Sequence, residues 1–166
     1  MLSNSRDRRL LGTLASLSML VLLAACAGTP QPNQQTAATP PKGGIGHYKL
    51  GSPYKVDGRW YTPRYERVYR QEGIASWYGE PFHGRLTANG EVFDRHSISA
   101  AHPTLPLPSV VKVTNLENGR WLELRVNDRG PFVGDRMIDL SQAAARELGF
   151  ENAGLAKVRV EFIKLA

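Results

Sequence analysis

Acidic side chains and one histidine recur in short polar segments between residues 84 and 141. The segment GRLTANGEVFD, residues 84–94, contains an Asn-Gly turn followed closely by two carboxylates, Glu91 and Asp94. Three later segments each add one candidate: His102 in AAH, Asp128 in NDRGP and Asp139 in IDLS. Carboxyl and imidazole groups perform general acid–base chemistry when a fold brings them together. The first hypothesis is therefore an acid–base site assembled from separate segments.

Each of these residues also has a purely structural interpretation. Glu91 and Asp94 could be solvated side chains on the shoulder of a hairpin, because acidic residues are common near turns. His102 could be a buried histidine with satisfied hydrogen bonds, and Asp128 could fold back onto the following turn. Asp139 lies two residues before a predicted helix cap and could order the helix start. Residue type alone leaves these alternatives open.

Metal, nucleotide and nucleic-acid chemistry receive little support. One cysteine cannot build a zinc cluster, and the four histidines lack the short spacing of a two-histidine metal motif: His47, His83, His96 and His102. There is no phosphate-binding glycine loop and no nucleophile-elbow serine. The net charge is +6, and residues 1–25 hold three Arg and one Asp, so the remainder carries +4. We expect no metal, no other cofactor and no nucleic-acid partner.

The clearest predicted element is a β-hairpin over residues 109–128. Two alternating apolar runs flank Asn118-Gly119, the dipeptide that most favours a two-residue hairpin turn. Leu122, Leu124 and Val126 fall on one face of the second strand. With a period of two, Asp128 points the same way, toward an apolar interior that would raise its pKa.

The remaining pattern is mostly strands. Residues 158–163 alternate as a last strand, and residues 73–78 and 97–101 are shorter candidates. One helix is predicted over residues 142–148, with Ser141 as its N-cap and Gly149 just beyond its end. Many short strands with a single helix indicate an all-β fold, namely a small closed barrel.

The N-terminal quarter is typical of an exported lipoprotein. Arginines 6, 8 and 9 precede a mostly apolar stretch that ends in Leu23-Ala24-Ala25-Cys26, which resembles a lipobox. A membrane-spanning anchor is the alternative, but the stretch is shorter than the about 20 apolar residues that a span needs. The predicted organisation is a signal peptide (1–25), a lipidated Cys26 with a flexible linker (26–46), an extended lead-in (47–72) and the barrel (73–166).

Several sequence blocks together resemble the rare lipoprotein A (RlpA) family. They are GIASWYG (73–79), FHGRLTANGEVFD (82–94), AAHPTLPLPS (100–109), VTNLENGR (113–120), RVNDRGPF (125–132) and RMIDLSQAAARELG (136–149). The resemblance implies a six-stranded double-psi β-barrel and an endolytic peptidoglycan lytic transglycosylase, a lyase. Such an enzyme would cleave MurNAc–GlcNAc bonds in peptide-stripped strands and leave 1,6-anhydroMurNAc ends, in wall remodelling and daughter-cell separation.

The resemblance also assigns site residues by motif. Glu91, Asp94, His102 and Asp128 fall on the family's catalytic positions, and Asp139 is a possible fifth. We hypothesise that Asp128 or Glu91 is the acid/base, positioned by Asp94 and His102. Substrate contacts are expected from Trp77, Tyr78, Asn89 and Arg129, although an aromatic pair on a strand often belongs to a core.

Three functional alternatives remain at this stage. The rivals to a lytic transglycosylase are a non-catalytic glycan-binding or division-associated lipoprotein and an ordinary glycoside hydrolase with two carboxylates. Many family members have a further glycan-binding domain, whereas this sequence stops at Ala166. The expected partners are peptidoglycan strands, a membrane through Cys26 and possible divisome proteins. Ala27, with no aspartate beside the lipobox cysteine, resembles sorting to the outer membrane, facing the periplasm.

Overall fold

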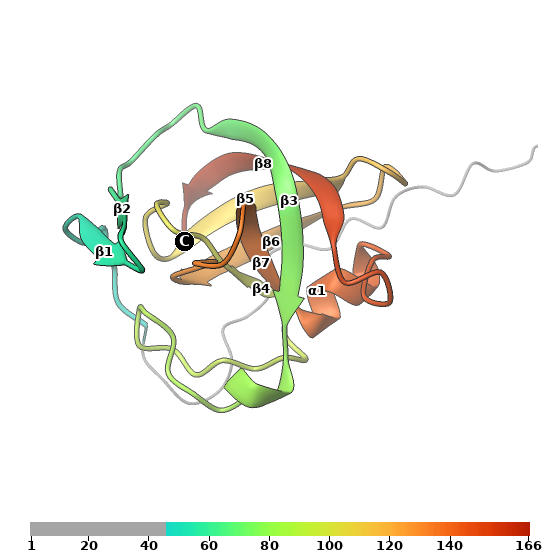
Figure 1. The fold of residues 1–166 in the computed structure, drawn as a ribbon, viewed down its shortest axis with the longest axis horizontal. Coiled ribbons are helices and arrows are strands. Elements are labelled where there is room, and N and C mark those ends of the chain that lie inside the picture. Colours follow the sequence, from blue (N-terminus) through green and yellow to red (C-terminus); the bar gives the residue numbers. More distant parts are fainter. Residues whose placement is uncertain (1–45) are drawn as a thin grey trace, which may run out of the picture. The chain divides into compact units, whose positions relative to one another are not determined.

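The computed structural model describes residues 46–166, so the predicted signal peptide, Cys26 and nearly all of the predicted linker lie outside the described residues. Six strands form a closed barrel in the order β3-β7-β4-β6-β5-β8 (Figure 1). They are β3 (Arg70–Tyr78), β4 (Ser99–Ala101), β5 (Ser109–Asn115), β6 (Trp121–Asp128), β7 (Arg136–Ser141) and β8 (Ala156–Leu165). The prediction of an all-β, six-stranded closed barrel is confirmed.

Apolar side chains from alternate strand positions fill the barrel. Val111 and Val113 of β5 and Leu122, Leu124 and Val126 of β6 are at most 1 % exposed. Burying an aliphatic side chain of this size contributes roughly 1.5–3 kcal/mol. The alternating apolar residues that predict the strands therefore also supply the core that stabilises the barrel. Parallel pairs (β3–β7 and β4–β6) and antiparallel pairs occur in the same barrel.

One helix, α1 (Gln142–Glu147), covers one end of the core with Ala144 and Ala145 buried. Ser141 Oγ accepts a hydrogen bond from the amide of Ala144 at 3.2 Å, as its position before the helix predicts. Gly149 takes a left-handed φ of 78° after the helix. The described residues also contain a 3₁₀ turn, η1 (Glu80–Phe82).

The β5–β6 turn differs from the prediction. Asn115 N donates to Arg120 O, so the loop contains residues 116–119, and no two-residue turn forms at Asn118-Gly119. Asn118 donates through Nδ2 to Leu148 O at 2.9 Å, which ties this loop to the end of α1. A tertiary contact therefore replaces the local turn preference.

A β-bulge separates the paired residues of β4 and β6. Ala100 pairs with Val126, whereas Ala101 pairs with Asp128, so Asn127 is the extra residue. A bulge shifts the side-chain alternation of the strand that carries it. Asp128 consequently lines a surface cleft beside Ala101 and does not join the core cluster. The prediction that Asp128 faces the barrel interior is wrong for this reason.

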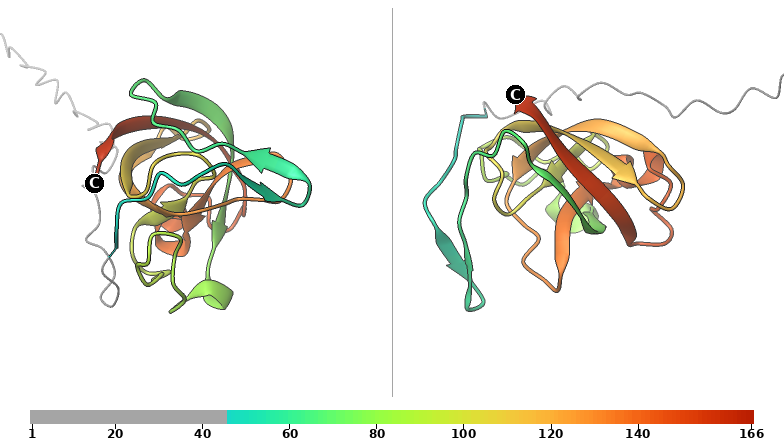
Figure 2. Two further views of the ribbon diagram at one scale, coloured as in Figure 1. Left: turned by 90° about the vertical axis from the view of Figure 1, so that its left-hand side faces the viewer. Right: turned by 90° about the horizontal axis from the view of Figure 1, so that it is seen from above.

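The lead-in packs along the barrel and carries its own hairpin, β1 (Tyr54–Val56) and β2 (Arg59–Tyr61), drawn in cyan-green beside the barrel in Figure 2. Tyr54 stacks on Tyr61 at 5.4 Å between ring centroids, and both rings meet Phe132 edge-on. Lys49 bridges to Leu107 through both backbone groups. The lead-in is thereby attached to the loops that follow β4 and β6.

Candidate active site

A cleft of about 460 Å³ opens where β3, β4 and β6 end and β7 passes. Side chains from all four strands line it, together with the loop of residues 129–133. The lining includes the aromatic, charged and small residues Trp77, Tyr78, Ala101, Asp128, Arg136 and Asp139. Two of the five predicted acid–base residues therefore share one cleft.

Strand register explains how Asp128 and Asp139 come together. Ala101 of β4 pairs with Asp128 on one neighbouring strand and with Asp139 on the other. Paired residues project to the same side of a sheet, and two strand spacings separate the backbones of the two aspartates by roughly 10 Å. The methyl group of Ala101 leaves open space between the two carboxyl groups.

Asp128 is held through one of its two oxygens. Its Oδ1 accepts hydrogen bonds from the amides of Ala88 and Arg129, both at 2.8 Å. Its Oδ2 has no hydrogen-bond partner among the described residues. Burial raises the pKa of Asp128 despite these two amide bonds and the nearby charges of Arg129 and Lys49. The side chain is therefore oriented, and it keeps its proton to a higher pH than an ordinary aspartate does.

Asp139 lies in a different electrostatic setting. Arg136 Nη2 contacts its Oδ2 at 3.3 Å, while burial raises the pKa of Asp139 more than the Arg136 charge lowers it. Three buried atoms at this cleft have no hydrogen-bond partner within residues 46–166: Tyr78 Oη, Arg136 Nε and Asp139 Oδ1. Buried polar atoms are normally satisfied, so three such atoms around one cleft are an exception.

Tyr78 forms an aromatic wall of the cleft. Its ring stacks on Phe93 at 4.2 Å and meets Phe82 edge-on at 5.8 Å. Burial raises the pKa of Tyr78 well above its usual value; the charges of Asp128 and Asp139 add to this effect, and the Ser99 side chain opposes it. Trp77 donates through Nε1 to Glu151 O and packs against the core as well as lining the cleft. Both side chains line the cleft, and their contact with substrate stays a prediction.

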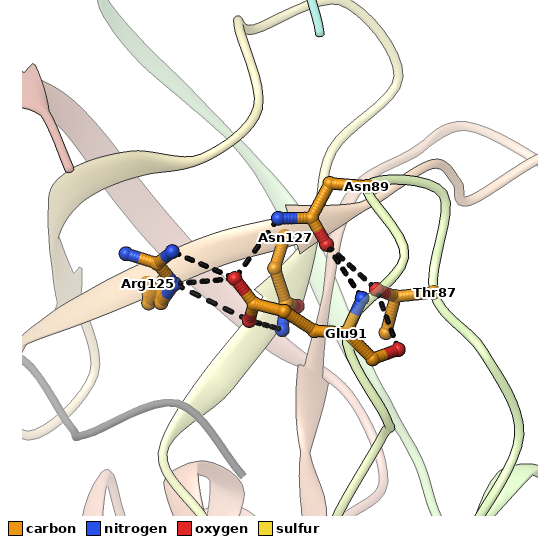
Figure 3. Close-up of polar contacts among 5 residues, drawn as sticks. All are labelled: Thr87, Asn89, Glu91, Arg125 and Asn127. Atoms are coloured by element: carbon orange, nitrogen blue, oxygen red, sulfur yellow. Dashed lines mark hydrogen bonds and ion pairs between the residues drawn. The ribbon is translucent and has the colours of Figure 1, made fainter. Parts of the chain in front are cut away.

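Glu91 lies outside the lining of this cleft, in a polar network of its own (Figure 3). Arg125 donates to it from Nη2 at 2.6 Å, Asn127 Nδ2 at 2.8 Å and Asn89 Nδ2 at 2.9 Å. Burial alone would raise the pKa of Glu91, but these donors together lower it. The carboxylate is 1 % exposed and remains ionised.

The Glu91 network holds the turn that orients Asp128. Asn89 is fully buried and bonded to Glu91, and its neighbour Ala88 donates the amide hydrogen bond to Asp128. Asn127 belongs to the bulge that places Asp128 on the cleft. The backbone at Gly46 passes so close to Glu91 that a Cβ there would lie within 2.6 Å of Glu91 Cγ. Asn89, predicted to contact substrate, is covered in this arrangement.

Asp94 organises the next turn. It accepts hydrogen bonds from the amide of His96 and the hydroxyl of Ser97, both at 2.9 Å. Burial tends to raise its pKa, but these bonds and the nearby His83 and His96 lower it. Asp94 lies outside the cleft lining, although its neighbour Phe93 stacks on Tyr78.

His102 is a buried, neutral side chain. Its Nδ1 accepts from the amides of Thr104 and Leu105, which leaves the proton on Nε2 for a 2.9 Å hydrogen bond to Tyr69 Oη. Burial, followed by the charge of Arg129, lowers the pKa of His102 to about 3. The ring therefore fixes the loop after β4.

Arg129 uses its guanidinium for backbone contacts. It donates to the carbonyls of His102 and Leu105 and, at 2.8 Å, to that of Leu50 in the lead-in. The residue lines the cleft, but these bonds make it a clamp between three segments.

Neither a metal site nor a membrane span emerges from residues 46–166. No group of three or more His, Cys, Asp or Glu side chains in this range is arranged to hold a metal ion. Over the same range, no helix is long and apolar enough to cross a bilayer.

Residues 70–160 match the family model described as lytic transglycolase. The chain belongs to this lytic transglycolase family. Relatives named endolytic peptidoglycan transglycosylase RlpA include one from Neisseria meningitidis serogroup B strain MC58, which is 48 % identical over 87 % of this chain and 61 % of the relative. Another, from Rickettsia prowazekii, is 52 % identical over 72 % of this chain and 38 % of the relative. A relative of the same name from Pseudomonas aeruginosa strain UCBPP-PA14 is 58 % identical over 68 % of this chain and 33 % of the relative. The chain thus spans between one third and three fifths of the length of these curated relatives.

Two solved structures show weaker similarity. The Streptomyces papain inhibitor is 26 % identical with a TM-score of 0.48, covering 58 % of this chain and 96 % of the inhibitor. The apo expansin of Clavibacter michiganensis is 17 % identical with a TM-score of 0.45, covering 58 % of this chain and 51 % of the expansin.

The structure of this lytic transglycolase family member adds residues that the motifs did not single out. Arg125 and Asn127 surround Glu91, and Tyr69 is the partner of His102. Arg136 and Ala101 belong to the cleft itself. The spacing of Arg125 and Asn127, two apart on one strand, is a signal that places both side chains on one face. Nothing local indicates that Glu91 lies opposite them.

Proposed function

We propose that this chain is an endolytic peptidoglycan lytic transglycosylase that cleaves MurNAc–GlcNAc bonds in peptide-stripped glycan strands. The main supporting observation is the pair Asp128 and Asp139, two carboxyl groups with raised pKa that flank Ala101 in one cleft. Family membership and the printed name of the relatives agree with this assignment. The aromatic wall at Tyr78 suits the face of a sugar ring.

Asp128 is the acid/base in this proposal. Its Oδ1 is held by two amides, so a proton on Oδ2 faces the cleft and can pass to the glycosidic oxygen as the bond to C1 breaks. The resulting carboxylate then accepts the proton of the same sugar's C6 hydroxyl, whose oxygen bonds to C1. The products are a 1,6-anhydro end and a free hydroxyl on the leaving sugar, and no water is consumed.

Asp139 stabilises the positive charge that develops at C1. Arg136 favours its ionised form, and the carboxylate lies on the far side of Ala101 from Asp128. Preorganised charge of this kind is most effective in a cleft that excludes water. Burial raises the pKa of both aspartates more than their hydrogen bonds and neighbouring arginines lower it. One of them, Asp128, can therefore act as the proton donor while the other, Asp139, acts as the anion.

The other motif residues position the cleft in this proposal. Glu91 is held ionised by Arg125 and its amide neighbours, which makes it unsuitable as a proton donor. It fixes the turn that donates to Asp128, while His102 fixes the loop after β4. Asp94 secures the turn that follows Phe93.

Mass spectrometry of digested glycan tests the assignment. Wild-type protein should release 1,6-anhydro ends from peptide-stripped strands, and Asp128→Asn should lower the rate by about 10²- to 10⁴-fold, the range for general acid–base catalysis. Asp57→Asn, in the exposed β1–β2 turn, is the matched control and should match wild type. Reducing ends would indicate a hydrolase, and co-sedimentation with murein without any product would indicate a binding protein.

We further propose that Cys26 carries the lipid anchor and that the enzyme acts from the outer membrane in wall remodelling. The supporting observation is the lipobox-like Leu23-Ala24-Ala25-Cys26, which lies outside the described residues. Radiolabelled palmitate should enter the wild-type chain, and Cys26→Ala should abolish labelling and release the protein from membranes. Label retained in Cys26→Ala would refute the anchor.

A further inference from the structure

A second hollow of about 440 Å³ adjoins the cleft that contains Asp128 and Asp139. Pro131 and Arg136 line both, so the two hollows lie on either side of these residues. Lead-in residues such as Arg59 and Arg64 form one side of the second hollow, and Gln71 and Glu72 of β3 form another. Arg136 is therefore within reach of a ligand that occupies the cleft of Asp128 and Asp139.

Arg136 lies at the junction with unused hydrogen-bonding capacity. Its Nη2 contacts Asp139 Oδ2 at 3.3 Å, and its Nε is buried without a partner among the described residues. A guanidinium has five N–H donors in a planar fork that matches a carboxylate. The contact with Asp139 occupies Nη2, so Nη1 can donate to a second anion, since the side chain is 28 % exposed.

Most acids of the second hollow already have an arginine partner. Glu66 pairs with Arg64, and Glu72 pairs with Arg159. Asp135, next to Arg136, has no ion pair within residues 46–166, and neither does Arg59, whose guanidinium lies over the Tyr61 ring. The hollow is therefore polar and nearly balanced in charge, and Arg136 is the one of its arginines that also lines the cleft of Asp128 and Asp139.

We propose that Arg136 binds the free lactyl carboxylate of a MurNAc residue in the strand that occupies the cleft. The inference rests on the proposed function and specifies its substrate class. Each MurNAc bears a lactyl group at C3, close to the C1 at which bond cleavage occurs. Removal of the peptide stem turns the lactyl amide into a carboxylate, so an arginine beside Asp139 distinguishes stripped strands from peptide-bearing ones.

Two matched substrates and three variants test this inference in the full chain. The substrates are peptide-stripped glycan oligosaccharides with free lactyl carboxylates and the same oligosaccharides with those groups converted to methylamides. The wild type should show a kcat/KM about tenfold or more higher on the free carboxylate, the contribution of one hydrogen bond to a charged group. Arg136→Gln should lose most of that ratio, chiefly through KM on the free carboxylate.

Arg136→Lys keeps the charge without the planar fork and should reduce the ratio less than Arg136→Gln. Arg70→Gln removes an arginine that pairs with Glu161 and lines neither hollow, so its ratio should equal that of the wild type. An unchanged ratio in every Arg136 variant that retains its circular dichroism spectrum would overturn the inference. So would a wild type that treats both substrates alike.

Failure of the proposed function gives a different result. In that case wild-type protein releases no product from either substrate, and calorimetric Kd values for the same two oligosaccharides replace kcat/KM. Tighter binding of the free carboxylate that disappears in Arg136→Gln would support the inference without catalysis. Equal binding of both would overturn it.

Discussion

At the scale of single residues, environment separates side chains of the same chemical type. Glu91 is buried yet ionised because Arg125 and two amide groups donate to it, whereas Asp128 is buried with only two backbone donors. One carboxyl pKa is lowered and the other raised. His102 provides a further case, since two backbone amides donate to Nδ1 and so keep the ring neutral with its proton on Nε2.

The first prediction concerns acid stability. The pKa of His102 is about 3 in the folded state against 6.5 in an unfolded chain. The contribution of the neutral His102 ring to the free energy of unfolding is fully present above pH 6.5. It is lost as pH falls from there to about 3, because in that range only the unfolded state takes up the proton. The full loss is on the order of 5 kcal/mol.

Urea unfolding at pH 7.5 and pH 4.5 measures this effect. His102→Asn should be less stable than wild type at pH 7.5 by about 1–3 kcal/mol, through loss of the Tyr69 bond, and should lose less stability at pH 4.5. His47→Asn, at an exposed position, is the control and should behave like wild type. Identical pH dependence in His102→Asn and wild type would contradict the assignment.

At the scale of elements, strand register and one bulge determine what the cleft contains. Asn127 is the extra residue that turns Asp128 away from the core and toward Ala101. β4 is only three residues long, yet it pairs with both β6 and β7 and so places Ala101 between Asp128 and Asp139. The space between the two carboxyl groups therefore depends on one methyl group.

The second prediction tests that space. Ala101→Leu should fill the space between the carboxyl groups and abolish binding of glycan oligosaccharides, measured by calorimetry, because the added atoms occupy the position of the ligand. Ala101→Gly should retain binding within a few-fold, since it leaves the cleft open. A thermal melt checks folding of both variants, and undiminished binding by a folded Ala101→Leu would show that substrate lies elsewhere.

At the scale of the described unit, residues 46–166, a closed barrel supports a much smaller attached hairpin. β5 pairs with β6 and β8 along most of its length, while β1 and β2 have three residues each and pair only with one another. The hairpin adheres through the aromatic contacts of Tyr54 and Tyr61 with Phe132 and a bond from Tyr54 to Pro103 O. Two-stranded hairpins are marginally stable in water.

The third prediction is a gradient of amide hydrogen exchange. Val111 and Val113 of β5 should exchange only through global unfolding, whereas the β1–β2 amides should exchange orders of magnitude sooner through local opening. Exchange measured by NMR or mass spectrometry would show this directly. Saturating glycan should slow exchange in the β1–β2 hairpin if bound glycan extends along the lead-in, and equal protection of both regions in the free protein would contradict the gradient.

Local sequence patterns predicted much of the barrel, and the exceptions come from contacts between segments that are distant in the chain. The alternating runs gave β5, β6 and β8, and Ser141 with Gly149 gave the bounds of α1 to within one residue. The Asn118-Gly119 turn was misjudged because Asn118 bonds to Leu148, a partner 30 residues away. The facing of Asp128 was misjudged because a single-residue bulge leaves no mark in the apolar alternation.

By itself, the sequence determined most of the barrel strands, the helix and the set of candidate residues, but neither β7 nor the β1–β2 hairpin, because hydrophobic period, caps and motif spacing are properties of neighbouring residues. Only the tertiary structure decided that Asp128 and Asp139 share a cleft while Glu91 joins Arg125 and Asn127 outside it. Those relations come from pairing between strands that are distant in the chain. Burial and hydrogen-bond partners, which set the charge each carboxyl carries, are likewise supplied by residues far away in sequence.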